Sequence, residues 1–360
     1  MQTIMNQELT NLLSTYKLGA IQLANRIVMA PMTRSRALGN IPNQLMADYY
    51  TQRASAGLII TEGVSPSPNG LGYSRIPGLF NEEQAAGWKL TTDVVHAKGG
   101  KIFIQLMHTG RVAHQLNLPA GAEVVAPSAI AAAGSMWTDT QGMQEQVAPK
   151  AIPTNEIADV IQEYVNSAKL AIAAGFDGVE IHGANGYLPM QFLSPGSNQR
   201  TDQYGGSHEN RNRFVLELAT AVADAIGKDK TGIRLSPFNK FNDITADEHE
   251  EAQYLALAEG LGKIGLVYMH FLTFTMTPEF IANMKTAFGG PLMLNGGYTA
   301  ARAESDIASG KCELVSFGSS YIANPDLVAR MASGAELAAP DQATFYTPDA
   351  KGYTDYPSLN

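Results

Sequence analysis

The chain has 360 residues, of which 45% are hydrophobic and 16% are charged. This composition supplies enough apolar side chains for a large core and excludes a disordered protein. The 25 basic and 34 acidic residues give a net charge of −9. That balance argues against affinity for nucleic acid or anionic membranes and favours a small-molecule partner.

The N-terminal segment 1–20 has no cationic start followed by an apolar stretch, and no later segment approaches the roughly 18 consecutive apolar residues of a membrane span. We therefore expect a cytoplasmic protein. One cysteine, Cys312, excludes an internal disulfide and a four-cysteine zinc or iron–sulfur site within one chain. Cys312 precedes an apolar run and is expected to be a small core residue. No metal site is expected.

Short apolar or β-branched runs alternate with segments of helical periodicity, which is typical of a parallel sheet with crossover helices. Eight strands are predicted, over residues 26–32, 57–62, 101–107, 178–182, 232–236, 266–270, 291–295 and 314–317. Eight strands fit a closed (β/α)8 TIM barrel better than an open doubly wound sheet. Although the length would allow two domains, we expect residues 1–360 to form a single barrel domain.

Capping residues and glycine stops mark the helices between these strands. Asn81 and Thr154 are expected to cap helices that end at residues 99–100 and 175. Further helices are predicted over residues 247–265, 299–310 and 324–334.

Two segments depart from this alternation. Residues 109–153 form a connection too long for a simple barrel loop, with strand-like pieces at 123–126 and 144–148. Such an excursion after the third strand is typical of a lid or rim over the site, the alternative being a solvated insertion. The tail after Pro340 is irregular but aromatic, so we expect it to pack back onto the barrel. Its aromatic residues are Phe345, Tyr346, Tyr353 and Tyr356.

In a barrel, catalytic groups lie where the strands end. His182, Asn185 and Tyr187 follow one predicted strand, and all three side chains can donate a hydrogen bond. With Gln105 and Arg234 at neighbouring strand ends, they favour a catalytic cluster that polarises a carbonyl or nitro oxygen. These ends carry no pair of carboxylates and no serine with a base, which disfavours glycosidases and hydrolases.

Glycines end the seventh and eighth predicted strands, as Gly296-Gly297 and Gly318, and helices begin soon after. Backbone N–H groups at such positions commonly bind phosphate in this fold. Tight turns alone would also explain these glycines.

Four segments of the chain form a recognisable pattern: Ala30-Pro31-Met32-Thr33-Arg34, Gln105-Leu106-Met107-His108-Thr109-Gly110-Arg111, His182-Gly183-Ala184-Asn185-Gly186-Tyr187-Leu188 and the run from Phe192 to Arg211. They closely resemble the old yellow enzyme family. The resemblance extends in order from Asn25 to Pro357 and so covers nearly the whole chain. It implies a barrel that holds FMN non-covalently, is reduced by NADPH or NADH, and passes hydride to electron-poor alkenes such as enones and maleimides, or to nitro compounds and nitrate esters. It also implies a monomer or a homodimer.

The resemblance assigns roles to individual residues. His182 and Asn185 would bind the substrate oxygen and Tyr187 would protonate the α-carbon. Residues of the cofactor site would be Pro31, Met32, Thr33 near the flavin O4, Gly63 against the ring, Gln105 and Arg234 at the pyrimidine edge, and Gly296, Gly297, Gly318 and Ser319. Tyr73, Met107 and Tyr346 would line the substrate cavity, although ordinary packing would also explain the two tyrosines.

Two positions depart from the family pattern. Ser319 stands where family members usually carry an arginine that clamps the FMN phosphate, which predicts weaker FMN binding. Met107 stands where a bulkier aromatic is common, which predicts a roomier cavity. The single cysteine places the chain in the simpler branch of the family without an iron–sulfur cluster.

Two other interpretations remain open from the sequence. One is a barrel that has lost tight flavin binding at Ser319 and performs redox-neutral proton chemistry with Tyr187 and His182. The other is a flavin-binding or sensing protein without turnover.

Overall fold

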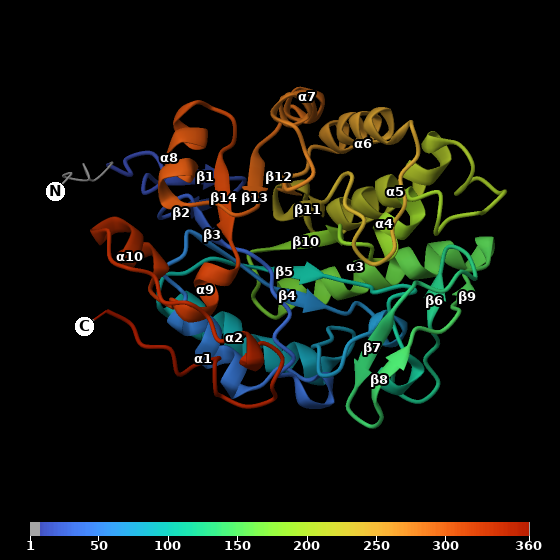
Figure 1. Ribbon diagram of the computed structural model, residues 1–360, viewed down its shortest axis with the longest axis horizontal. Helices are drawn as coiled ribbons and strands as arrows, with labels where there is room; N and C mark the ends of the chain where they lie inside the picture. The colour runs from blue at the N-terminus through green and yellow to red at the C-terminus, as the bar shows by residue number, and fades with distance from the viewer. Residues whose placement is uncertain (1–7, 360) are drawn as a thin grey trace.

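Eight parallel strands form a closed barrel in the computed structural model, which describes residues 8–359. Each strand pairs with the next barrel strand along the chain, and the last pairs with the first. The barrel strands are β3 (Ile27–Met29), β4 (Leu58–Val64), β5 (Ile102–Leu106), β10 (Gly178–Gly183), β11 (Thr231–Leu235), β12 (Tyr268–Leu272), β13 (Leu292–Asn295) and β14 (Leu314–Phe317). Each overlaps a predicted strand, and the predicted (β/α)8 barrel is confirmed (Figure 1).

Helices alternate with the barrel strands and surround them (Figure 1). They are α1 (Gln44–Gln52), α2 (Glu82–Ala97), α3 (Ile157–Ala173), α4 (Leu188–Leu193), α5 (His208–Ile226), α6 (Glu250–Ile264), α7 (Pro278–Phe288), α8 (Ala300–Ala308), α9 (Ser319–Ala323) and α10 (Leu327–Ser333). Among residues 8–359, no helix combines the length and apolar composition that a membrane span requires.

The predicted helix caps had mixed outcomes. Asn81 and Thr299 do cap α2 and α8, because their side chains accept hydrogen bonds from the backbone N–H three residues later. The prediction that Thr154 caps a helix was wrong. A 3₁₀ turn precedes α3, and the Thr154 hydroxyl donates a hydrogen bond to Asp202 instead. Asn324 also does not start a helix, since α10 begins at Leu327 and the Asn324 amide bonds to the carbonyls of Ser320 and Ala338.

A hairpin that was not predicted from the sequence closes the barrel at the N-terminal ends of its strands. It consists of the antiparallel strands β1 (Tyr16–Leu18) and β2 (Ile21–Leu23). Leu18 and Leu23 are buried in one apolar cluster with side chains from the first residues of β4, β12 and β14. Inside the barrel, Gly232 makes room for the Tyr268 ring, because a Cβ at this glycine would lie 2.4 Å from Tyr268 Cζ. The N-terminal part of the barrel interior is therefore a packed core.

The long excursion after β5 contains four short strands. β7 (Ser135–Thr138) and β8 (Gly142–Glu145) form an antiparallel hairpin, and β6 (Val125–Ala126) pairs with β9 (Lys150–Ala151). The predicted pieces at 123–126 and 144–148 overlap β6 and β8, whereas β7 and β9 were missed. Both pairs lie at the edge of the molecule in Figure 1, outside the barrel wall.

The C-terminal tail packs back onto the barrel, as predicted. Tyr353 is fully buried and stacks on Tyr49 of α1 with ring centroids 4.0 Å apart. Arg36 is also buried and donates to the carbonyls of Thr344 and Phe345. These contacts hold the tail beside the C-terminal ends of the barrel strands. Cys312 is buried, as predicted.

Candidate active site

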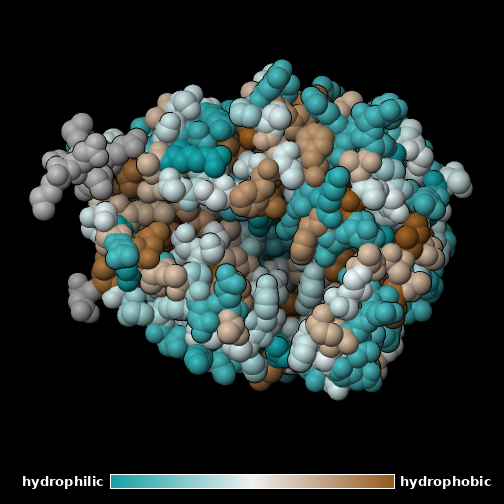
Figure 2. Space-filling view, viewed as in Figure 1, coloured by the Kyte–Doolittle hydropathy of each residue, from teal (hydrophilic) through white to brown (hydrophobic). Residues whose placement is uncertain are grey.

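A cavity of about 1340 Å³ opens at the C-terminal ends of the barrel strands. Figure 2 shows a hollow near the middle of this face. The barrel strands and the segments just after them contribute Pro31, Thr33, Gly63, Gln105, Met107, His182, Asn185, Tyr187 and Arg234 to its lining. In parallel strands these ends meet at one edge, which explains why positions so far apart in sequence converge.

The floor of the cavity rests on a buried polar network. Gln105 Nε2 donates to Glu180 Oε1 at 2.8 Å, and His270 Nδ1 lies 2.9 Å from Glu180 Oε2. Strand register places these residues together, because Glu180 is level with Gln105 on β5 and Arg234 is level with both His182 and His270. Since the Gln105 amide nitrogen is used by Glu180, its carbonyl oxygen is left to accept a hydrogen bond in the cavity.

Arg234 brings a positive charge to this floor. Burial lowers the pKa of Arg234, and the nearby Glu180 raises it in opposition. Burial alone raises the pKa of Glu180, but His270, Arg234 and the hydrogen bonds outweigh burial, so the Glu180 pKa lies below its ordinary value. Arg234 Nη2 reaches Asn295 Oδ1 at 3.3 Å, whereas its Nε is buried without a partner among the described residues. Arg234 lines the cavity and its guanidinium carries five N–H donors, so donors remain for an acceptor there.

His182 and Asn185 form one wall of the cavity. His182 Nδ1 accepts from the backbone N–H of Ala184 at 3.3 Å, so the ring proton lies on Nε2. Burial, followed by the charge of Arg234, lowers the pKa of His182 well below its ordinary value, which keeps the ring neutral. Asn185 adopts a left-handed backbone conformation with φ 56°, which asparagine tolerates better than most residues. Both side chains can therefore present an N–H to one ligand oxygen.

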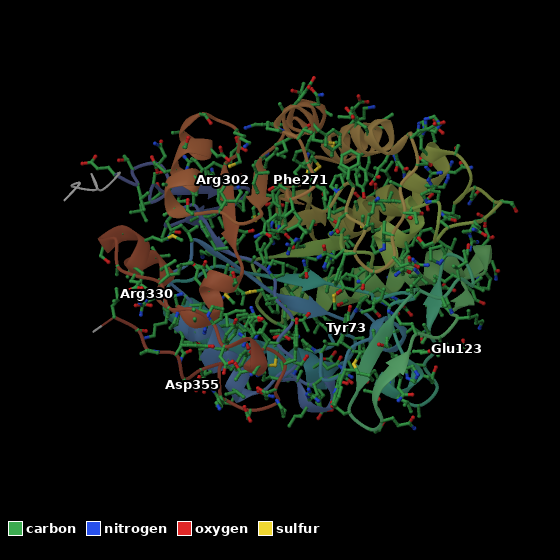
Figure 3. All side chains as sticks on the ribbon, viewed as in Figure 1. Tyr73, Glu123, Phe271, Arg302, Arg330 and Asp355 are labelled. Atoms are coloured by element: carbon green, nitrogen blue, oxygen red, sulfur yellow. The ribbon has the colours of Figure 1, made fainter. Side chains whose placement is uncertain are left out.

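Tyr187 stands beside this pair. Its ring meets His182 edge-on with centroids 4.8 Å apart, and its hydroxyl lies 3.1 Å from that of Tyr73. Burial and the neighbouring Tyr73 raise the pKa of Tyr187 well above its ordinary value. The hydroxyl is consequently a proton donor at neutral pH. In Figure 3, Tyr73 lies near the β7–β8 hairpin.

The structure brings most, but not all, of the predicted site residues into this cavity. Tyr73 and Tyr346 line it, as does Met107, which belongs to the same buried apolar cluster as Tyr187. Predicted residues outside the lining are Met32, Gly296, Gly297, Gly318 and Ser319. Four of these five lie just after β13 and β14, at the barrel end where the fold commonly binds phosphate.

Two further parts of the lining were missed by the sequence analysis. The hairpin contributes Met136, Trp137 and Met143, and the loop after β11 contributes residues 241–243. The hairpin has no alternating pattern strong enough to predict its place. The loop could have been found, since it follows a barrel strand directly and carries two amide side chains, Asn239 and Asn242.

A closed barrel with a proton donor, two N–H donors and a buried cation at its mouth defines an oxidoreductase or proton-transfer enzyme of the TIM-barrel class. The comparisons with known proteins decide between these. Residues 11–338 match the NADH:flavin oxidoreductase / NADH oxidase family. The chain belongs to this family.

Relatives and solved structures agree with this assignment. A putative 12-oxophytodienoate reductase 11 of Oryza sativa subsp. japonica is 40% identical, with 97% of each chain covered. A probable flavin mononucleotide-dependent alkene reductase of Leishmania infantum is 41% identical, with 95% of each chain covered. The structure of morphinone reductase in complex with tetrahydroNAD superposes with a TM-score of 0.94 at 45% identity and 98% coverage of both chains. The chain is thus an enzyme of the old yellow enzyme type that uses FMN and a nicotinamide reductant.

The residues at the mouth fit a flavin. The Arg234 guanidinium and the Gln105 carbonyl, both on side chains that line the cavity, suit a ring edge that carries both acceptors and an N–H. Gly318 is loosely surrounded, since a Cβ at this position would make only an ordinary van der Waals contact, with Met32 Sδ at 3.6 Å. A cation also lies at the glycine end of the site, because Arg302 Nη1 donates to the Gly296 carbonyl at 3.3 Å.

Proposed function

We propose that this enzyme is an NAD(P)H-dependent ene-reductase that acts on electron-poor alkenes such as enones and maleimides, and also on nitro compounds and nitrate esters. The observation that carries the proposal is the wall formed by His182, Asn185 and Tyr187. It joins two N–H donors for one oxygen to a tyrosine that keeps its proton.

These side chains match the charge changes of alkene reduction. Hydrogen bonds from His182 Nε2 and Asn185 Nδ2 to the carbonyl oxygen would draw electron density from the β-carbon and stabilise the enolate. The Tyr187 hydroxyl would then deliver a proton to the α-carbon. When bound, FMN supplies the hydride for the β-carbon.

The remaining cofactor residues would hold the flavin from several sides. Gln105 and Arg234 would bind the pyrimidine edge, Thr33 would donate toward O4, and Pro31 and Gly63 would border the ring. Met32, Gly296, Gly297, Gly318 and Ser319 would serve the remainder of the cofactor, including its phosphate. A fixed cation at Arg234 stabilises negative charge on a reduced flavin.

We also propose that the chain is one domain in which residues 109–153 act as a lid. The support is that the hairpin supplies part of the cavity lining while the barrel supplies the reactive residues. Tyr73 and Tyr346 would stack a flat substrate.

Anaerobic titration tests the proposed function. FMN-saturated protein should lose its yellow colour with NADPH or NADH and regain it when cyclohexenone is added. Bleaching without recovery of the colour by any enone, maleimide or nitro compound would contradict the proposed substrates. Bound FMN that no nicotinamide bleaches would point to a binding or sensing protein, and failure to take up FMN would point to redox-neutral proton chemistry.

A further inference from the structure

Asn239, in the loop after β11, lies directly behind Asn185. Its Nδ2 is 3.1 Å from Asn185 Oδ1, and its own Oδ1 accepts from the backbone N–H of Phe241 at 3.0 Å. Asn239 is partly buried and does not belong to the cavity lining. It therefore contacts a residue of the proposed oxygen site without reaching the cavity.

These two hydrogen bonds fix which way each amide faces. A backbone N–H can only donate, so the Asn239 atom facing Phe241 must be the oxygen. The opposite atom of Asn239 is then the nitrogen, and it can only donate to the oxygen of Asn185. Asn185 Nδ2 is left without a partner among the described residues, at a side chain that lines the cavity.

Other contacts hold the Asn185 backbone and leave its amide free to rotate. Its N–H donates to Ser236 Oγ at 2.9 Å, and its carbonyl accepts from Asn242 Nδ2 at 2.8 Å. An asparagine amide can rotate by half a turn without moving the backbone, which would exchange its donor and acceptor. Asn239 is the residue whose hydrogen bond distinguishes the two orientations.

We propose that Asn239 is a positioning residue that directs the Asn185 N–H, rather than its carbonyl, toward the ligand oxygen. The chain of donors runs from the Phe241 backbone through Asn239 and Asn185 to the substrate. This inference rests on the proposed function, because it specifies how the oxygen site of that function obtains its second donor.

The sharpest variant is Asn239→Asp, which keeps the size of the side chain and its acceptor for Phe241. A carboxylate cannot donate, so the Asn185 amide should reverse, give its N–H to Asp and turn its carbonyl toward the cavity. Asn239→Ala removes both contacts and fixes neither orientation. The matched control is Lys240→Gln, which makes the same charge change at the next, exposed residue of the loop.

The probe is a simple phenol titrated into the FMN-loaded, oxidised protein and followed by absorbance. Two N–H donors favour the phenolate, and an electron-rich phenolate stacked on an oxidised flavin gives a long-wavelength charge-transfer band. We expect the dissociation constant to rise several-fold in Asn239→Ala and roughly ten- to hundredfold in Asn239→Asp. The band should also be weak in Asn239→Asp at saturation, because a carbonyl facing the ligand favours the neutral phenol.

The order of the two variants separates orientation from packing. If Asn239 only filled space, the isosteric Asp would be milder than Ala. A purely electrostatic effect of the new charge would fade at high salt and would appear in part in Lys240→Gln, whereas a reversed amide is insensitive to salt. Melting temperature and FMN content verify that each variant is folded. If Asn239→Asp does not fold, Asn239→Ala still tests the proposal, because phenol binding equal to that of the parent would overturn it.

Either of two results would overturn the inference. One is an Asn239→Asp variant that binds phenol as tightly as the parent does. The other is a smaller rise in the phenol dissociation constant for Asn239→Asp than for Asn239→Ala. If the parent itself gave no band with phenol and no reoxidation by cyclohexenone, the proposed function would fall as well. A parent that does both, with an unaffected Asp variant, would remove this inference alone.

Discussion

The surroundings of individual side chains in this enzyme determine their protonation states. His182 is kept neutral and Tyr187 is kept protonated, both chiefly by burial. A neutral donor beside a protonated acid is the combination that binding an oxygen and protonating a carbon require.

Tyr187→Phe should remove the proton donor without disturbing the fold. We expect enone turnover to fall roughly 10²- to 10⁴-fold, while phenol binding changes little. Stopped-flow reoxidation of the reduced protein measures this step. Tyr73→Phe, which removes the hydroxyl 3.1 Å away, is the control and should have a smaller effect. Equal rates for Tyr187→Phe and the parent would assign the proton to another group.

Ser319→Arg should tighten FMN binding. Ser319 is exposed at the first residue of α9, so a longer cationic side chain has room there. One charge-assisted contact corresponds to about 1.5–3 kcal/mol, or roughly ten- to hundredfold in the dissociation constant. Fluorescence titration of the apoprotein with FMN measures it. Unchanged affinity would indicate that other groups, such as Arg302, already satisfy the phosphate.

Met107→Trp should narrow the cavity above Gly63. A Cβ at Gly63 would already lie 2.5 Å from Met107 Sδ, so this part of the wall has little spare room. We expect the specificity constant to fall more for bulky enones than for cyclohexenone. Parallel assays of both substrates measure the ratio, and the same ratio in the two proteins would refute the prediction.

Among the structural elements, three segments beside the cavity are linked by one shared arginine, Arg75. Arg75 donates to the Ser35 carbonyl at 3.1 Å, to the Tyr346 carbonyl at 2.9 Å and to Asp139 of the hairpin turn. It thereby links the loop after β3, the C-terminal tail and the β7–β8 hairpin. These three segments form part of the cavity wall.

Arg75→Met should loosen the hairpin and the tail together. We expect limited proteolysis within residues 133–147 to become several-fold faster, and the free energy of unfolding to fall by about 1–3 kcal/mol. The control is Lys89→Met, which breaks an exposed ion pair of 2.6 Å on α2 and should change neither quantity. If cleavage remains as slow as in the parent, Arg75 does not hold the hairpin.

The barrel elements could be predicted from the sequence, but the rim could not. Buried strands such as Leu58–Val64 begin with a short apolar run, here Leu58-Ile59-Ile60, and are followed by helices, and this signal does not depend on tertiary contacts. The hairpin depends on distant partners such as Arg75 and Asp243, which no local pattern reveals. The cluster of His182, Asn185 and Tyr187 could be found because all three follow one strand. The role of Asn239 could not, since it depends on the direction of two hydrogen bonds.

For the molecule as a whole, one buried ionisable group is Glu62, which lies next to Arg34, a residue that donates to the Gly352 carbonyl of the tail. It accepts from the Arg34 backbone N–H and from the Tyr50 hydroxyl, both at 3.3 Å. Burial raises its pKa to about 7, although Arg34 and Tyr50 lower it in opposition. Because the folded pKa exceeds the unfolded value of 4.5, the folded protein binds more protons between pH 4.5 and 7. This group therefore loses its contribution to stability as the pH rises through that range.

Glu62→Gln should remove that dependence. Relative to the parent, the free energy of unfolding of the variant should rise from pH 5 to pH 8 by on the order of 3 kcal/mol or less. Urea unfolding at a fixed FMN concentration measures the difference. A constant difference across this range would mean that Glu62 ionises equally in the folded and unfolded chain.

The β1–β2 hairpin has a kinetic consequence. Because Leu18 and Leu23 are buried at the N-terminal end of the barrel strands, we expect reductant and alkene to enter and leave from the cavity at the C-terminal ends. The two molecules must then take turns, each departing before the other arrives. Double-reciprocal plots of initial rate against the concentration of one reactant, at several fixed concentrations of the other, should be parallel. An excess of either reactant should inhibit turnover, because it occupies the site that the other reactant needs.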